Sequence, residues 1–374
     1  MIPFNKPFLT GEETTYIKQA VHSGKISGNG MFTEKCQHFF EKNYGIKKAL
    51  LTTSCTDALE MCALLLNIKE GDEIIMPSYT FVSTANAFVL RGAKIIFCDS
   101  KKNQPNIDET KIEKLISERT KAIVVVHYSG VACEMDEILS IAKKHSLFVV
   151  EDAAQAIESY YKGRPLGSIG HLATFSFHET KNIQCGEGGL LAINDEQFIE
   201  RAEIIWEKGT NRSAFFRGEI DKYGWVDIGS SFLPSEIVAA FLYAQLEKMK
   251  IIQSRRIEIW EQYNKQLLPI KKQGKFYLPI IPDYATHNGH LFYLVCKSFN
   301  ERRKLINYLN QKEVQAVFHY QPLHKSQYFK NKYTGDPLVN CDRFGECLVR
   351  LPFFYELTES QQAHITKEIQ QFYS

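Results

Sequence analysis

The chain has 374 residues, of which 44% are hydrophobic and 24% are charged, a composition typical of a globular protein. This length predicts one large domain and one smaller domain. The formal net charge is only +2, so no broad basic field favours nucleic acid as a partner. No stretch approaches the roughly 18 apolar residues that a membrane span needs, so we expect no membrane segment.

The nine cysteines are irregularly spaced and form no C-x-x-C pair, which argues against both a disulfide framework and a zinc site. The N-terminus lacks a cationic segment followed by an apolar run, so we expect no signal peptide. Both observations favour the cytoplasm. His319 and His324 lie five residues apart on an irregular segment that contains proline, which is poor geometry for a metal, and we expect no metal site.

From residue 46 onward, short apolar runs alternate with segments of helical periodicity. Strands are predicted at 49–53, 73–77, 94–98, 122–127 and 147–151. Helices are predicted between them at 57–66, 81–90, 112–116 and 138–144. This alternation predicts a mostly parallel β-sheet with helices on both faces.

The pattern changes after about residue 250. Helices are predicted at 234–249, 251–268, 301–310 and 360–372, and strands at 291–296 and 314–318. We therefore expect a large α/β domain over residues 1–250 and a small α+β domain over residues 251–374.

Polar clusters follow several of the predicted strands of the large domain. They are Ser54-Cys55-Thr56, Glu151-Asp152 and the segment 175–178. Ligands of parallel sheets bind at the carboxyl ends of the strands, so these clusters are expected to converge on one site.

Two residues of these regions, Lys181 and Asp152, have the chemistry that a pyridoxal phosphate site needs. Lys181 lies just past an apolar strand in a segment rich in turn-forming residues, where a dry environment would depress its pKa and allow imine formation. Asp152 ends a buried strand and could pair with the ring nitrogen of pyridoxal phosphate (PLP), which is a strong electron sink only when protonated. Their ordinary alternatives are a solvated loop lysine and a helix N-cap.

Other residues would complete a PLP site. Ser54 and Thr56 precede a helix, where backbone N–H groups and hydroxyls bind anions, although simple capping also places such residues there. Ser176 could reach the same phosphate. Gln155 could donate to the phenolic oxygen of the cofactor, and Phe81 could stack on its ring; a solvated amide and a core phenylalanine are the alternatives.

Motifs of other enzyme classes are absent. No G-x-G-x-x-G follows an early strand, so a nicotinamide dinucleotide site has no support. The sequence also contains no Walker loop and no G-x-S-x-G elbow.

Taken together and in order, four segments resemble the DegT/DnrJ/EryC1/StrS family of sugar aminotransferases. They are SCTDAL at 54–59, PSYTFVSTANA at 77–87, EDAAQ at 151–155, and SFHETKN at 176–182 followed by GEGG at 186–189. The resemblance extends from Pro3 to the C-terminus. It implies the fold of fold-type I PLP-dependent transferases, similar to aspartate aminotransferase, and a homodimer whose active sites lie at the subunit interface.

The resemblance also implies a role for each matching position. Lys181 would be the Schiff-base lysine, Asp152 the partner of the pyridinium, and Gln155 the partner of the cofactor O3′. The phosphate would be held by Ser54, Thr56 and Ser176, the ring would be covered by Phe81, and Cys55 and Ser231 would be further cofactor-binding positions. Two positions depart from the family pattern: Cys55 stands where glycine is usual, and Ser231 stands where an asparagine reaches the phosphate of the neighbouring subunit.

Within the family, the segments 78–94, 127–136 and 207–218 are most similar to enzymes that aminate dTDP-4-dehydro-6-deoxy-D-glucose with L-glutamate. The expected product is dTDP-4-amino-4,6-dideoxy-D-galactose, a precursor of surface polysaccharides such as O-antigen or enterobacterial common antigen. Arg212 and Arg217 are candidate pyrophosphate contacts, with solvated loop arginines as the alternative. His319 is a candidate substrate contact or a packing residue.

Several alternatives stay open. The enzyme could form the gluco epimer or accept a C3 ketone. A PLP sugar dehydratase would carry histidine at the position of Lys181, which argues against that branch. A non-catalytic PLP-binding regulator lacks support because the chain has no DNA-binding segment or basic stripe.

Overall fold

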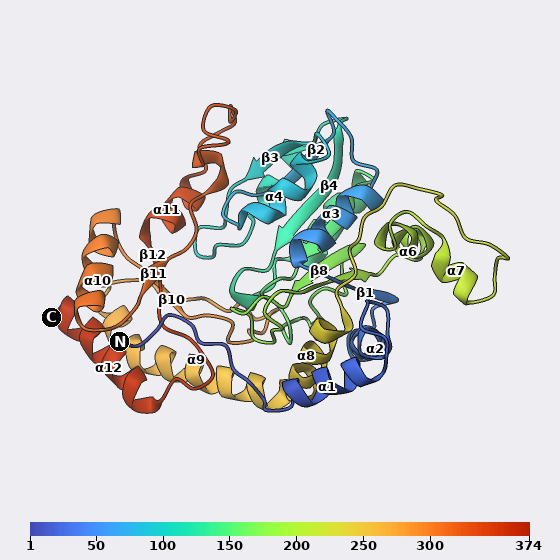
Figure 1. The fold of residues 1–374 in the computed structure, drawn as a ribbon. Helices are drawn as coiled ribbons and strands as arrows, with labels where there is room; N and C mark the ends of the chain where they lie inside the picture. The colour runs from blue at the N-terminus through green and yellow to red at the C-terminus, as the bar shows by residue number, and fades with distance from the viewer.

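A seven-stranded sheet forms the centre of the molecule, and the computed structural model describes all residues from 1 to 374 (Figure 1). The order of its strands is β1-β9-β8-β5-β4-β2-β3. Their bounds are β1 Lys48–Thr52, β2 Glu73–Pro77, β3 Lys94–Cys98, β4 Thr120–Val126, β5 Phe148–Asp152, β8 Leu172–Ser176 and β9 Gly189–Ile193.

All strands of this sheet except β9 run in one direction. β9 pairs antiparallel with both β1 and β8, while β8, β5, β4, β2 and β3 pair in parallel. The mostly parallel sheet predicted from the sequence is therefore confirmed. The carboxyl ends of β1, β2, β5 and β8 meet at one edge, where the start of β9 also lies because Gly189 pairs with Ser176.

Side chains alternate between the two faces of the sheet, as the pleat requires. In β2, Ile74 and Met76 belong to one core, and Ile75 belongs to the other. The first core is covered by α3 (Cys55–Leu65), α4 (Val82–Val89) and α6 (Ile199–Trp206). The second is covered by α2 (Met31–Tyr44), α5 (Met135–Lys144) and α8 (Glu236–Glu247).

The C-terminal part contains a three-stranded antiparallel sheet in the order β10-β12-β11. α9 (Met249–Lys272) runs from the large sheet towards this part along one side of the molecule (Figure 1). The other elements of this part are β10 Tyr293–Val295, α10 Phe299–Gln311, β11 Val317–Phe318, α11 Val339–Cys347, β12 Leu348–Arg350 and α12 Glu359–Tyr373. The first core of the large sheet continues into this region without a break.

The first residues of the chain lie against the C-terminal part. Ile2 pairs with Val314, and the N–H of Phe353 donates to the carbonyl of Phe4 at 3.1 Å. The predicted large domain, residues 1–250, includes these residues. We propose instead that the N-terminal segment belongs with the small domain, because its backbone hydrogen bonds are made there.

α2 begins without a capping side chain of its own, because its N-cap is Gly30. The buried carboxylate of Glu236, at the start of α8, replaces it. Glu236 accepts hydrogen bonds from the N–H groups of Gly30, Phe32 and Thr33 at 3.0, 2.7 and 3.0 Å. A negative charge at the helix N-terminus also complements the helix dipole, so α8 fixes the position of α2.

One predicted helix is wrong. Residues 112–116 form no α-helix: only Glu113–Leu115 is helical, as a short 3-10 turn that follows another at Glu109–Lys111. So short a segment has too few propagating hydrogen bonds to offset helix nucleation.

Several elements were not predicted, among them α2, α6, α11, β9 and β12. The remaining helices and strands are α1 Glu13–His22, α7 Arg212–Phe216, β6 Tyr160–Tyr161 and β7 Arg164–Pro165, with further 3-10 turns at Tyr128–Gly130, Glu196–Phe198 and Leu323–Lys325. No helix combines the length and the apolar character that crossing a bilayer would require.

Candidate active site

Asp152 is the last residue of β5, and its carboxylate is buried. One carboxylate oxygen accepts a hydrogen bond from Thr84 Oγ1 at 2.7 Å, and the other accepts from the N–H of Ala154 at 3.2 Å. No lysine, arginine or histidine lies within ion-pair distance of it. Burial therefore raises the pKa of Asp152, and the hydrogen bond from Thr84 opposes only part of this shift.

The Thr84 hydroxyl is itself held by Thr80, since their Oγ1 atoms are 2.8 Å apart. A hydroxyl has one proton, so Thr84 donates it to Asp152 and accepts a hydrogen bond from Thr80. Sequence reasoning missed both threonines. Their spacing of four residues across the start of α4 was the only available signal.

Lys181 lies in the connection between β8 and β9. The connection is closed by the pairing of Ser176 with Gly189 and by the hydrogen bond from the N–H of Lys181 to the carbonyl of His178 at 2.9 Å. Loss of solvation lowers the pKa of Lys181, while the nearby Cys55 and Asp152 oppose this shift. An amine with a lowered pKa is present in its nucleophilic form at a lower pH than an ordinary lysine.

The hydroxyl cluster predicted to bind phosphate lies at the N-terminus of α3. Ser54 is the N-cap and accepts from the N–H of Asp57 at 3.1 Å. Thr56 Oγ1 donates to Ser83 Oγ at 2.8 Å, so α4 contributes a hydroxyl that the sequence did not reveal. Ser176, at the end of β8, pairs with Gly189 of β9. Gly189 lies so close to Ser54 that an added Cβ would be 2.3 Å from the Ser54 backbone, so Ser176 lies beside this turn.

Cys55 occupies the first position of α3, where its thiol is half-buried. Burial and the charge of Asp152 raise the pKa of this thiol to about 12. Cys55 is therefore a neutral thiol at neutral pH. It packs beside the site rather than supplying a charge to it.

Gln155 and Phe81 both lie next to Tyr320. Gln155 Nε2 donates to the Tyr320 hydroxyl at 3.2 Å, and its Oε1 accepts from the N–H of Ser129 at 2.7 Å. Phe81 caps α4 with 55% of its surface exposed, and its ring centroid is 6.0 Å from that of Tyr320. A cavity of about 470 Å³ opens between these two rings and the segment 323–329. Tyr320 thus joins the site from the C-terminal part.

His319 also reaches the site from the C-terminal part. Its Nδ1 is 3.0 Å from the Tyr128 hydroxyl, and burial lowers its pKa well below the usual value. His324 does not reach the site. Its Nδ1 is 2.8 Å from Ser78 Oγ and its Nε2 is 3.1 Å from Asp342, so it fastens the 323–325 turn to the end of β2.

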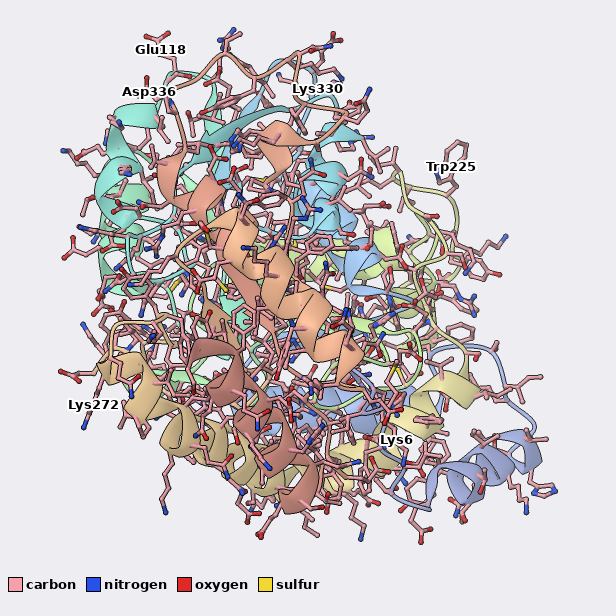
Figure 2. The ribbon with its side chains drawn as sticks, turned by 90° about the vertical axis from the view of Figure 1, so that its left-hand side faces the viewer. Lys6, Glu118, Trp225, Lys272, Lys330 and Asp336 are labelled. Atoms are coloured by element: carbon pink, nitrogen blue, oxygen red, sulfur yellow. The ribbon has the colours of Figure 1, made fainter.

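Arg212 and Arg217 form ion pairs within their own segment, whereas Ser231 precedes Phe232, whose carbonyl accepts from the N–H of Thr53 at 3.0 Å, next to the Ser54 turn. Arg212 pairs with Glu207 at 3.4 Å, and Arg217 pairs with Glu203 and Glu219 at 2.8 and 2.7 Å. Ser231 is exposed and bridges to Glu207. Figure 2 shows Trp225, from the same segment, standing clear of the ribbon at the periphery.

A buried pair supports the end of β5 from behind. Glu151 accepts hydrogen bonds from His127 Nε2 and from the N–H groups of Gly167, Ile169 and Gly170, at distances from 2.6 to 2.9 Å. Burial opposes the charge, yet the bonds from His127 and the backbone hold the pKa of Glu151 below its usual value. Glu151 thus orients β5 next to Asp152 without facing the cofactor position.

A larger cavity of about 580 Å³ lies beside β3 and the segment 328–338. None of Lys181, Asp152 and Gln155 lines this cavity or the cavity between Phe81 and Tyr320. The chemistry-bearing residues therefore identify the site better than cavity size does.

A profile of the DegT/DnrJ/EryC1/StrS aminotransferase family matches residues 7–370. The chain belongs to this family. GDP-perosamine synthase from Escherichia coli O157:H7 is 32% identical to it over 100% of this chain and 99% of that protein. The spore coat polysaccharide biosynthesis protein SpsC from Bacillus subtilis is 32% identical over 96% of this chain and 93% of that protein.

Solved structures agree with this assignment. Helicobacter pylori PseC, an aminotransferase involved in the biosynthesis of pseudoaminic acid, superposes with a TM-score of 0.91 at 27% identity, covering 100% of this chain and 99% of PseC. The fold is that of PLP-dependent aminotransferases, as the sequence predicted. The chain is therefore a PLP-dependent sugar aminotransferase.

The residues present fit PLP. Asp152 offers a buried carboxylate without a cationic partner, as a protonated ring nitrogen requires. Ser54 and Thr56 offer hydroxyls at a helix N-terminus, as a phosphate requires. Lys181 offers an amine with a lowered pKa near that carboxylate.

Proposed function

We propose that this enzyme transfers the amino group of L-glutamate to C4 of dTDP-4-dehydro-6-deoxy-D-glucose. The products are dTDP-4-amino-4,6-dideoxy-D-galactose and 2-oxoglutarate. The observation that supports the proposal is that Asp152 ends β5 and Lys181 follows the neighbouring strand β8 at the carboxyl edge of the sheet, where burial shifts the pKa of both groups.

Each residue of the site has a proposed role. PLP, when bound, supplies an electron sink for the charge that develops at the reacting carbon. Asp152 keeps the ring nitrogen protonated, and Gln155 donates to the phenolic oxygen from its position against Tyr320. Ser54, Thr56 and Ser176, with the adjoining Cys55 backbone, hold the phosphate, and Phe81 covers the ring.

Lys181 moves the proton in both halves of the reaction. Its Nζ holds the cofactor between turnovers and, once displaced by the donor, takes the proton from the α-carbon of L-glutamate. After 2-oxoglutarate has left, the same Nζ delivers a proton to C4 of the sugar. The face that receives this proton decides between the galacto and the gluco product.

The assembly that we propose is a homodimer with shared active sites. Arg217 and Ser231 are exposed and Arg212 is partly exposed, which suits residues that serve the site of a second copy. In that arrangement Ser231 bonds the phosphate of the neighbouring cofactor, and the two arginines contact the pyrophosphate of the nucleotide. His319 contacts the sugar from within its own chain.

The Lys181→Ala variant tests the proposed mechanism. We expect kcat for amino transfer from L-glutamate to the keto-sugar to fall by at least about 100-fold, because the general base is lost. The measurement is 2-oxoglutarate release under saturating substrates. The matched control is Lys18→Ala, which removes an exposed lysine of α1 and leaves the rate unchanged. Undiminished turnover of Lys181→Ala would eliminate the mechanism.

A GDP-linked keto-sugar is the second candidate acceptor, because a relative that matches the full chain is named GDP-perosamine synthase. Turnover with the dTDP-linked and GDP-linked 4-keto-6-deoxy sugars at equal concentration separates the two. NMR of the isolated amino-sugar then distinguishes C4 from C3 amination and the galacto from the gluco configuration. A strong preference for the GDP-linked sugar would overturn the dTDP assignment.

A further inference from the structure

Asn182, the residue that follows Lys181, is a buried amide held by three hydrogen bonds. Its Nδ2 donates to the carbonyl of Asn288 at 2.9 Å and to Oε1 of Gln253 at 3.1 Å. Its Oδ1 lies 2.9 Å from Nδ1 of His290. Consecutive residues of a chain have Cα atoms about 3.8 Å apart, so the bonds that fix Asn182 also restrict the backbone of Lys181.

His290 donates the third of these hydrogen bonds. The amide nitrogen of Asn182 already faces two acceptors, so the amide oxygen is the atom that faces His290, and Nδ1 of His290 carries a proton. Burial lowers the pKa of His290 well below its usual value, so the ring is neutral at neutral pH. The His290 ring therefore has one N–H group, and Asn182 accepts its hydrogen bond.

Asn288 holds the segment that contains Gln155. Its side chain is fully buried, and its Nδ2 donates to the carbonyls of Gln155 and Ile157 at 2.8 and 2.7 Å. Its Oδ1 accepts from the N–H of His290 at 3.0 Å. Gln155 follows Asp152, the last residue of β5, by three positions. Residues 288–290 therefore bond to the connections that follow both β5 and β8.

Residues 288–290 are themselves held against α9. The buried guanidinium of Arg256 donates to the carbonyls of Gly289 and His290 at 3.0 and 2.7 Å. Gly289 has a φ of +56°, and a Cβ at this position would lie 2.7 Å from the carbonyl oxygen of Arg256, so only glycine fits. A rigid segment that bonds to two parts of a site can fix the distance between them.

We propose that His290 and Asn288 are positioning residues, which hold Lys181 at a fixed place relative to Asp152 and Gln155. His290 acts on Lys181 through Asn182, and Asn288 acts on Gln155 through its backbone carbonyl. The inference rests on the proposed role of Lys181 in proton transfer. A misplacement of about 1 Å can lower the rate of such a step by about 100-fold. Loss of the bond from His290 should therefore lower kcat and leave KM unchanged.

Two substitutions of His290 separate the effect of its hydrogen bond from the effect of its bulk. Asparagine and leucine side chains have nearly the same shape, but only asparagine has an N–H donor near the position of the histidine Nδ1. In His290→Leu we expect kcat to fall by about 10- to 100-fold in both half-reactions, because Lys181 moves a proton in each. KM for L-glutamate and for the keto-sugar should stay within about twofold of the wild type. His290→Asn should regain kcat to within about threefold of the wild type.

The rate of cofactor capture provides a readout that does not depend on turnover. Cofactor-free protein is mixed with PLP, and absorbance follows the reaction with Lys181. We expect capture by His290→Leu to be about 10-fold slower than capture by the wild type or by His290→Asn. The double variant Asn182→Leu, His290→Leu removes both partners of the bond, so it leaves no unpaired amide oxygen at residue 182 that could prevent folding. It should show the same slow capture.

Thr366→Val is the matched control for stability. Thr366 is buried, and its Oγ1 donates to Oε1 of Gln266 at 2.8 Å, between α12 and α9. This variant and His290→Leu each lose one buried hydrogen bond, so both should unfold at a lower temperature than the wild type. Thr366→Val should nevertheless keep the wild-type kcat and the wild-type rate of PLP capture.

Three results would overturn the inference. One is a wild-type kcat together with wild-type PLP capture in His290→Leu. The second is an equal defect in His290→Asn and His290→Leu, which would assign the effect to packing. The third is an equal loss of kcat in Thr366→Val, which would assign the effect to stability. A Lys181→Ala protein with undiminished turnover would instead refute the proposed function, whatever the His290 variants do.

Discussion

At the scale of single residues, we expect the buried carboxylate of Asp152 to lower the stability of the cofactor-free protein while it is needed for activity. Its pKa in the folded protein is raised by burial, so its contribution to stability is fully present below the ordinary value of 3.8 and is lost as the pH rises through the folded pKa. Asp152→Asn should therefore make the cofactor-free protein more stable at pH 7, while amino transfer collapses. Urea unfolding at pH 7 and pH 5 measures the change, which should shrink at the lower pH.

Asp221→Asn is the control for this experiment, since Asp221 is exposed and its side chain forms no hydrogen bond or ion pair. It should leave stability and activity unaltered at both pH values. A cofactor-free Asp152→Asn protein that unfolds more easily than the wild type at pH 7 would contradict the expected sign.

The sequence identified Lys181, Asp152 and Gln155 because each belongs to a short motif of neighbouring residues that indicates its chemical role. It missed Thr84 and Tyr320. Thr84 bonds Asp152 across 68 positions, and Tyr320, from the C-terminal part, accepts from Gln155 across 165 positions. Such contacts depend on tertiary packing, which local spacing does not encode.

At the scale of elements, the anchoring of α2 by Glu236 gives a stability prediction. Glu236→Gln replaces one carboxylate oxygen with an amide that faces helix N–H donors, so we expect a loss of about 3 kcal/mol in the free energy of unfolding. Glu247→Gln, an exposed position on the same helix, should cost less than about 1 kcal/mol. Equal effects in denaturant unfolding would show that α2 does not depend on this carboxylate.

Five strands of the large sheet, β1 to β5, were predicted to within two residues, because buried apolar runs between turn signals have few alternative structures. No bounds were predicted for β8, and β9 was not predicted. The helices before residue 46 were not predicted. α2 has a glycine at its N-cap, and the charge that completes its first turn comes from residue 236. No window of neighbouring residues contains that information.

At the scale of the whole molecule, the exposed segment 207–231 is expected to be covered by a second copy. It displays Phe216 and Trp225 with 69% and 83% of their surfaces exposed. Large apolar groups gathered on one surface mark an interaction site. The double variant Phe216→Ser, Trp225→Ser should sediment as a monomer with greatly reduced activity, while Val339→Ser, an exposed apolar residue elsewhere, should sediment like the wild type. A wild-type chain that is already monomeric at assay concentration would refute the shared site.

The position of β1 at one edge of the large sheet affects how the chain can fold while it is being synthesised. β1 is the first strand to be synthesised, yet β9, about 140 residues later, is its only neighbour. Until residues 189–193 have emerged, the nascent chain carries an apolar strand with two unpaired edges, the condition that favours association between chains. Translation that stalls before β9 should therefore yield insoluble fragments. The β8–β9 hairpin, whose connection contains Lys181, is also the segment that joins β1 to the rest of the sheet.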